Sequence, residues 1–293
     1  MSASYHGSGS RVLRALAAWT VVALFFFPIY YWFSVAFRPE NQIFNRPPLV
    51  FGWDFSAKSF EEVFGISFGG DAARSLAGGG NFYMMPRLID TIIVAVGSTA
   101  LVVVIATLAS YSLSRMRFRA QHHFVFWILS TRMMPPVAVA IPMFFIYKEI
   151  GLMDTHVGII LVHALMNLPL AVLLLKSFFD DIPQEIDEAA LIDGASRWLI
   201  FRRIVLPMAL GGIAATAVLC FIFSWTEFLF VLTLTQTGLK TVPVVSSTFV
   251  TSTGTAWGKM AALGVGAMVP AFIFILLVQK NLVRGLTMGG LKQ

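Results

Sequence analysis

Long apolar segments recur along this chain, and they constrain its fold more than any other feature. Polar and charged residues gather in the stretches between them. A helix of about 20 apolar residues crosses a hydrocarbon core of about 30 Å, and an α-helix satisfies its own backbone groups there. We therefore expect an all-α membrane protein. Its six predicted transmembrane helices lie at residues 15–37, 91–113, 123–147, 157–178, 208–235 and 260–283.

The composition agrees with a membrane protein and excludes an ordinary soluble domain. Hydrophobic residues make up 57% of the chain and charged residues only 12%, and the mean hydropathy is +0.79. The net charge of +6 would suit a nucleic-acid partner, but the basic residues lie between the apolar segments and form no single patch, so we expect none. The single cysteine, Cys220, lies in an apolar segment and cannot form an intrachain disulfide.

The positions of lysine and arginine predict that both termini are cytoplasmic. Short cytoplasmic loops of membrane proteins carry an excess of these residues. With the amino terminus inside, the inner segments hold most of them, including Arg115, Arg117 and Arg119. A phosphate-binding stripe is the alternative interpretation of these three arginines. The resulting organisation is a cytoplasmic tail at 1–14, a six-span domain at 15–283 with an extracytoplasmic loop at 38–89 and a cytoplasmic loop at 180–207, and a cytoplasmic tail at 284–293.

The first apolar segment has a second interpretation as a cleaved signal peptide. Ser34-x-Ala36 resembles a cleavage pair, but the segment is longer and more aromatic than a usual signal core. We favour an uncleaved membrane anchor. The loop that follows contains Pro47-Pro48 and several glycine runs, which predict irregular structure with one short helix near Ser59 to Val63.

Prolines interrupt the predicted third span. Pro135, Pro136 and Pro142 remove backbone donors and predict a bend. Such bends are tolerated inside a membrane where neighbouring helices or a water-filled cavity satisfy the freed carbonyl groups.

Three polar residues within apolar segments are candidates for function: Arg132, Asn167 and Glu227. A charge at the centre of a bilayer costs at least about 2.5–3.5 kcal/mol, so these side chains should face the bundle interior or a wet cavity. They either line the translocation path or form interhelical hydrogen bonds. Arg132 and Glu227 fall at different depths, which argues against their direct pairing. His163 is expected to be an interhelical hydrogen-bonding residue.

Residues 183–207 form the one long polar interruption in the second half of the sequence, and their pattern predicts two short helices joined by a turn. The first begins near Pro183, whose missing N–H matters little in a first turn, with Asp180 and Asp181 as candidate caps. Gly194 allows a sharp turn. Composition alone also fits an amphipathic loop resting on lipid headgroups.

The second short helix is expected to start with Ser196 as its cap and to end at Pro207. Across both helices the order is Glu188-Ala189-Ala190, three residues, Gly194, nine residues, then Ile204-x-Leu206-Pro207. This order resembles the EAA loop of binding-protein-dependent ABC importer permeases. Ile192-Asp193-Gly194-Ala195 and the residues 284–290 are similar to the carbohydrate-uptake branch, whose permeases are of the MalG type.

The resemblance implies that this loop is a cytoplasmic coupling helix between spans four and five, which docks into a separate ATPase subunit. Glu188 would contact the ATPase, the two alanines would allow close approach, and Gly194 would supply the turn. The residues implied in coupling are Glu188, Ala189, Ala190, Asp193, Gly194, Leu206 and Pro207. The family's Trp-Asn-Glu sequence near the end of span five reads Trp225-Thr226-Glu227 here.

The function implied is that of the permease subunit of an ATP-driven importer, which carries a sugar or polyol across the bacterial cytoplasmic (inner) membrane. The implied partners are a second homologous permease, forming a heterodimer, two ATP-binding subunits and an extracytoplasmic sugar-binding protein. The alternative is a secondary transporter driven by an ion gradient, which would want acidic residues near mid-membrane or a repeated layout. Only Glu227 is a candidate, and no second half mirrors the first.

The chain shows no sequence pattern for chemistry of its own. It lacks the G-x-x-x-x-G-K-[ST] loop that cradles phosphates, the H-E-x-x-H zinc pattern and any cysteine pair. The adjacent His122 and His123 should point apart at a helix start, which makes a metal site a poor interpretation. We expect no catalytic residues, no metal and no cofactor, and therefore a transport subunit rather than an enzyme.

Overall fold

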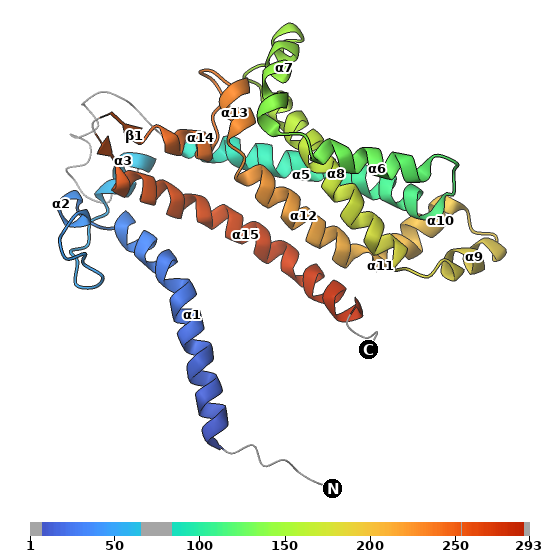
Figure 1. Cartoon of the computed structure of the whole chain (residues 1–293), viewed down its shortest axis with the longest axis horizontal. Coiled ribbons are helices and arrows are strands. Elements are labelled where there is room, and N and C mark those ends of the chain that lie inside the picture. The colour runs from blue at the N-terminus through green and yellow to red at the C-terminus, as the bar shows by residue number, and fades with distance from the viewer. Residues whose placement is uncertain (1–7, 66–83, 253, 290–293) are drawn as a thin grey trace. The chain divides into compact units, whose positions relative to one another are not determined.

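The computed structural model describes residues 8–65, 84–252 and 254–289, and this part of the chain is mostly helical (Figure 1). Its strands are one antiparallel pair, β1 (Val250–Thr251) and β2 (Gly254–Thr255). The chain divides into two compact units. One comprises Met1–Met84 and Thr248–Gly266, and the other Met85–Ser247 and Ala267–Gln293.

The first unit contains α1 (Ser8–Ala36), α2 (Glu40–Ile43), α3 (Lys58–Phe64) and the start of α15 (Trp257–Gly289). The short helix predicted near Ser59 to Val63 is confirmed as α3. Trp32 of α1 meets Trp257 of α15 edge to face, and Lys259 of α15 forms an ion pair with Glu62 of α3 at 2.8 Å. The glycine runs at 69–70 and 78–80, for which irregular structure was predicted, lie outside the described residues.

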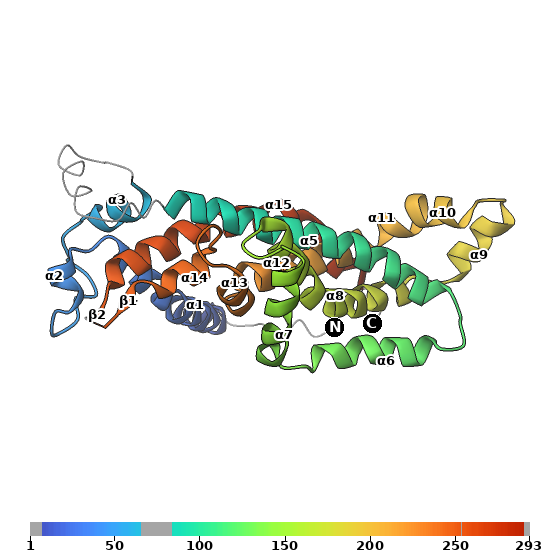
Figure 2. The ribbon, with the colours of Figure 1, turned by 90° about the horizontal axis from the view of Figure 1, so that it is seen from above.

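The second unit is a helical bundle in which α8 contacts several neighbours. It packs against α6, α12 and α13, and the Ser110 hydroxyl of α5 donates to the Val172 carbonyl of α8 at 2.8 Å. Figure 2 shows α5, α8 and α12 overlapping along the length of this unit. Its helices are α5 (Met84–Arg115), α6 (Gln121–Arg132), α7 (Pro136–Glu149), α8 (His156–Asp180), α9 (Glu185–Ile192), α10 (Arg197–Ile200), the π-helix Phe201–Val205, α11 (Leu206–Met208), α12 (Leu210–Trp225), α13 (Leu229–Leu234) and α14 (Val242–Ser247).

Four helices of the described chain are long and apolar enough to cross a membrane: Val12–Ala36, Met84–Arg115, His156–Asp180 and Trp257–Gln279. Two further helix pairs qualify only as bent spans, which gives four to six spans in total. These are α6 with α7, bent by 91°, and Arg197–Met208 with α12, bent by 72°.

The bend predicted at the prolines of span three is a full break between α6 and α7. Pro135 is the N-cap of α7 and has an extended backbone, and Pro136 is the first residue of the helix. A proline disfavours the helical conformation of the residue before it and supplies no N–H to bond backward along the chain. The two consecutive prolines therefore end α6 and start α7 in a new direction.

The predicted fifth span, 208–235, is wrong as a single helix. The chain bends at Ala209, α12 ends at Trp225, and α13 begins only at Leu229. Apolar residues continue on both sides of this break, so the hydropathy of the whole segment did not predict it. The carboxylate of Glu227 accepts hydrogen bonds from free amides at the start of α13 and so stabilises the point where the helix resumes.

Candidate functional site

The loop between α8 and α12 has the predicted form of two short helices joined by a turn. Figure 1 shows α9 and α10 at one end of the second unit. Gly194 has a φ of +84°, in the left-handed region that glycine adopts without strain. The Gly194 amide donates to the Leu191 carbonyl and the Ala195 amide to the Ala190 carbonyl, each at 3.0 Å. This pair of bonds is a Schellman motif with glycine in its usual place.

The second short helix is capped as predicted, but the first is not. The Leu199 amide donates to the Ser196 hydroxyl at 3.3 Å, which confirms Ser196 as the cap of α10. The N-cap of α9 is Gln184, whose side chain makes no capping bond, so the prediction of Asp180 and Asp181 as caps was wrong. The reason is that α8 runs through Asp180, which pairs with Lys176 one turn earlier at 2.6 Å.

Pro207 does not end the second helix, in contrast to the prediction. It lies inside α11, and the preceding residues 201–205 form a π-helix, in which the Leu206 amide bonds the Phe201 carbonyl. Proline has no N–H for the carbonyl four residues back, and the wider π turn changes the bonding pattern just before it. The helical direction changes two residues later, at Ala209. Leu206 is half-buried and Pro207 is exposed.

The two short helices present an apolar surface to solvent. Ile192 is 86% exposed and Trp198 61% exposed, and Leu191 and Leu199 are also exposed. Exposed apolar patches on a protein commonly mark interaction sites. We define the docking face as the exposed residues Glu188, Ala189, Leu191, Ile192, Asp193, Trp198 and Leu199.

The opposite side of α9 packs into the bundle. Ala190 is buried in a core cluster that also contains Phe179 of α8 and Ile200 of α10. The two alanines predicted to act in coupling therefore have different environments. Ala189 is exposed to solvent, whereas Ala190 packs α9 against the rest of the bundle. Asp187 is buried on this inner side as well.

Asp187 meets an arginine from the far end of α5. The Nε of Arg115 forms an ion pair with the Oδ2 of Asp187. The two guanidinium Nη atoms donate to the carbonyls of Phe179 at 3.0 Å and Ile182 at 2.9 Å. Sequence reasoning treated Arg115 as a topology determinant and did not single out Asp187. An acidic residue on the buried face of a short helix was the available signal.

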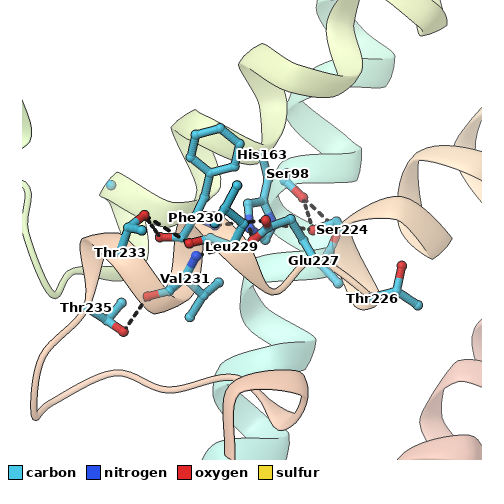
Figure 3. Close-up of polar contacts among 12 residues, drawn as sticks. Ser98, His163, Ser224, Thr226, Glu227, Leu229, Phe230, Val231, Thr233 and Thr235 are labelled. Carbon is cyan, nitrogen blue, oxygen red and sulfur yellow. Dashed lines mark hydrogen bonds and ion pairs between the residues drawn. The ribbon is translucent and has the colours of Figure 1, made fainter. Parts of the chain in front are cut away.

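A second group of polar residues lies inside the bundle, drawn in Figure 3. His163 is fully buried and its Nδ1 lies 2.7 Å from the Ser224 hydroxyl, which in turn accepts from the Ser98 hydroxyl at 2.8 Å. The His163 Nε2 lies 3.2 Å from the Oε2 of Glu227. We call Ser98, His163, Ser224 and Glu227 the polar cluster. It joins α5, α8 and α12 to the chain segment between α12 and α13.

Glu227 also caps α13. Its Oε1 accepts from the Phe230 amide at 2.8 Å and its Oε2 from the Val231 amide at 3.2 Å (Figure 3). A carboxylate at a helix start satisfies free N–H groups and complements the positive end of the helix dipole. One side chain therefore both starts α13 and ties it to α8.

The remaining predicted polar residues lie near the same helices but apart from Glu227. Arg132 donates from Nη1 to the Met166 carbonyl of α8 at 2.8 Å, and its guanidinium lies 5.4 Å from the centre of the Phe223 ring. Its side chain is exposed. Asn167 is buried on α8, four residues after His163 and so on the same helix face.

Asp154, which has an unusual positive φ of 60°, holds the loop before α8 against the loop after α13. Its carboxylate accepts from the amides of Gly238 at 2.7 Å, Leu239 at 2.9 Å and Thr237 at 3.2 Å. Burial alone would raise the pKa of Asp154, but these backbone hydrogen bonds outweigh it and hold the pKa below its ordinary value. Sequence reasoning missed this site.

Comparison with known proteins gives the family. Residues 102–288 match the family described as "Binding-protein-dependent transport system inner membrane component". The trehalose transport system permease protein SugB of Mycobacterium tuberculosis is 31% identical over 93% of this chain and 94% of its own. The trehalose/maltose transport system permease protein MalG of Thermococcus litoralis is 31% identical over 96% and 97%.

A solved structure shares the fold. In the crystal structure of a bacterial ABC transporter involved in the import of the acidic polysaccharide alginate, one chain superposes with a TM-score of 0.71 at 20% identity, covering 95% of this chain and 99% of that one. The matches confirm the family resemblance of the EAA loop, and they set aside a secondary transporter driven by an ion gradient. The chain belongs to the family of binding-protein-dependent transport system inner membrane components, the permease subunits of ABC importers.

Proposed function

We propose that this chain carries a sugar or polyol across the bacterial inner membrane as one half of a permease heterodimer. The relatives with trehalose or maltose in their names support a carbohydrate substrate. In this proposal the partners are a second homologous permease, two ATP-binding subunits and an extracytoplasmic sugar-binding protein. The family name itself implies a binding protein as partner.

The proposed topology has six spans with both termini in the cytoplasm. In it α6 and α7 together make one broken span, and α12 with α13 makes another. The loop that carries α9 and α10 then lies on the cytoplasmic side, where the positive-inside rule places its arginines. The segment around Asp154 lies on the outer side.

The docking face is the observation that carries this proposal. Ile192 and Trp198 expose large apolar side chains on a short helical hairpin that is fixed by Gly194. Charged residues border them, so the surface suits a specific protein partner better than lipid tails. We assign the ATPase contact to Glu188, Ala189 and Asp193. Ala190, Leu206 and Pro207 serve instead to seat and orient the hairpin.

The proposed mechanism follows from this arrangement. Closure of the ATPase dimer on ATP pulls α9, and the spans move as rigid bodies between inward-open and outward-open states. Arg132 is the residue proposed to line the translocation path, because its side chain is exposed although it lies within a predicted span. Asn167 is buried and Glu227 is half-buried, which supports a role for them in holding helices together.

The experiment is purification of the tagged chain, with its native partners, from its host in mild detergent. Glu188→Lys and Ile192→Asp should leave the chain inserted in the membrane but reduce the ATP hydrolysis that purifies with it by about tenfold or more. Each substitution places an unfavourable charge in the docking face. Asp181→Lys, a charge reversal at another exposed residue just before α9, is the matched control and should retain the ATP hydrolysis. Normal ATPase association in both docking-face variants would refute the assignment.

A further inference from the structure

The buried ion pair between Arg115 and Asp187 joins two helices that are distant in sequence. Arg115 is the last residue of α5 and Asp187 lies in the first turn of α9. Their side chains are 6% and 12% exposed. Within the part of the chain that the structure describes, this is the ion pair found between α5 and α9.

The guanidinium is held on three sides. Besides Asp187, it donates to the carbonyls of Phe179 and Ile182, at and just past the end of α8. Carbonyls at a helix end lack partners within the helix, and a cation there is favoured by the helix dipole. The planar fork of arginine fixes all these bonds in one geometry, which the single ammonium of lysine cannot do.

Asp187 depends strongly on this partner. Neither carboxylate oxygen has a hydrogen-bond partner within the described chain, and the Arg115 contact is the ion pair that the carboxylate makes there. A buried carboxylate without its counter-charge is strongly unfavourable. Separation of Asp187 from Arg115 would therefore be unfavourable.

The chain itself connects α9 to α8 and α10, but not to α5. A pull on α9 reaches α8 through residues 181–184, whereas it reaches α5 only through side-chain contacts. The ring of Tyr111 on α5 packs against Phe179 and Phe201, which gives an apolar contact beside the polar one. Leu113 of α5 and Ala190 of α9 share one apolar cluster, and the ion pair adds a directional, charged connection between α5 and the helix that bears the docking face.

We propose that Arg115 and Asp187 are positioning residues that transmit the movement of α9 to α5 and to the end of α8, so that ATP hydrolysis is coupled to transport. The inference rests on the proposed function, in which α9 receives force from the ATPase. Asp187 lies on the buried side of α9 and outside the docking face. Loss of the pair should therefore uncouple the two activities and leave ATPase binding intact.

The test uses the complete transporter in proteoliposomes that contain the cognate binding protein. Uptake of substrate and hydrolysis of ATP are measured together for Asp187→Asn and Arg115→Gln. We expect the ATPase subunits to remain bound, hydrolysis to stay within about twofold, and uptake per ATP to fall by about tenfold. Asp187→Glu, which keeps the charge, should recover part of the ratio. Arg117→Gln removes an exposed arginine two residues further along and should match the wild type.

A double variant protects the test against misfolding. Arg115→Gln with Asp187→Asn leaves no unpaired buried charge, so it should assemble even where a single variant does not. It should show the same loss of uptake per ATP. A normal ratio in the assembled double variant would overturn the proposal, as would a parallel fall of hydrolysis and uptake or loss of the ATPase from Asp187→Asn.

The two proposals fail in different ways. If Glu188→Lys and Ile192→Asp keep the ATPase bound, the docking assignment is wrong whatever the ion pair does. If those variants lose the ATPase while the double variant transports normally, docking stands and the transmission through Arg115 and Asp187 is wrong.

Discussion

His163 and Glu227 face each other inside the bundle, with the Nε2 of the imidazole 3.2 Å from the Oε2 of the carboxylate. His163 belongs to the continuous helix α8, and Glu227 to the irregular segment between α12 and α13. The contact fixes the position of the break relative to α8, while the second function of Glu227, capping α13, fixes where helix resumes. The break is therefore a defined feature of the fold.

Replacement of Glu227 should destabilise the bundle. Glu227→Gln keeps the shape of the side chain but removes its charge, which holds His163, and one of the two carboxylate oxygens that accept hydrogen bonds. A hydrogen bond to a charged group contributes about 1.5–3 kcal/mol. We expect a lower thermal unfolding midpoint in detergent, with a larger fall for Glu227→Ala. Glu149→Gln, an exposed carboxylate at the end of α7, is the control. An unchanged midpoint for Glu227→Ala would show that the polar cluster contributes little.

The hydrogen bonds of Asp154 to the amides of residues 237–239 should make the stability of the loops before α8 and after α13 depend on pH in a defined way. The folded pKa of Asp154 is lowered, with burial opposed and outweighed by the amides of Leu239, Gly238 and Thr237. Stability from this group is therefore fully present above its unfolded pKa, about 3.9, and is lost as pH falls through the still lower folded value. Asp154→Asn should lower the unfolding midpoint at pH 7, and its difference from the wild type should shrink only under strongly acidic conditions.

Unfolding midpoints of the wild type and Asp154→Asn, compared across pH, test whether the pKa of Asp154 is lowered. A difference between wild type and Asp154→Asn that disappears already near pH 6 would contradict a lowered pKa. Hydrogen exchange at the amides of Thr237 and Gly238 provides a local measurement, because these groups should be protected in the wild type and should exchange faster in the variant.

The effect of replacing Gly194 should depend on how readily the new residue adopts a positive φ, and not on the size of its side chain. A Cβ at this position would meet nothing within 4 Å, so the penalty comes from its φ of +84°. An ordinary residue in this region costs about 1–2 kcal/mol, whereas asparagine adopts it more readily. Uptake should therefore be highest for Gly194→Asn, lower for Gly194→Ala and lowest for Gly194→Val. Equal uptake by the asparagine and valine variants would show that the Schellman turn is not needed.

Arg132 should affect transport more than stability. It is exposed, and its guanidinium lies between the Met166 carbonyl and the Phe223 ring. Arg132→Gln should reduce uptake by about tenfold or more at an unchanged amount of protein in the membrane, if it lines the path. Lys148→Gln, at the exposed end of α7, should have no such effect. Full uptake by Arg132→Gln would remove it from the path.

Much of this architecture was predictable from local patterns. Apolar runs located the helices of the bundle, the consecutive prolines at 135 and 136 located the break between α6 and α7, and the glycine at 194 located the turn. Each is a property of a few neighbouring residues. Ser196 could be predicted as a cap for the same reason, since its acceptor serves an amide three residues away.

What could not be predicted depends on residues far apart in the sequence. Glu227, at the break between α12 and α13, has His163, 64 residues earlier, as its partner. Arg115 looked like a topology signal because its partner Asp187 belongs to a different loop. Asp180 was expected to cap α9, but α8 extends far enough to include it. In each case the tertiary contact, which the local pattern does not contain, decides the outcome.

The most direct test of the account is cross-linking from the docking face. The chain has a single cysteine, Cys220, so Cys220→Ala provides a background in which one cysteine is introduced at a time. A thiol-linked photoreactive group at Ile192→Cys should join the chain to the ATP-binding subunit in membranes from the host, and the same group at Phe145→Cys, exposed on α7, should not. An adduct from position 145 alone, or none with the ATPase from position 192, would contradict the account.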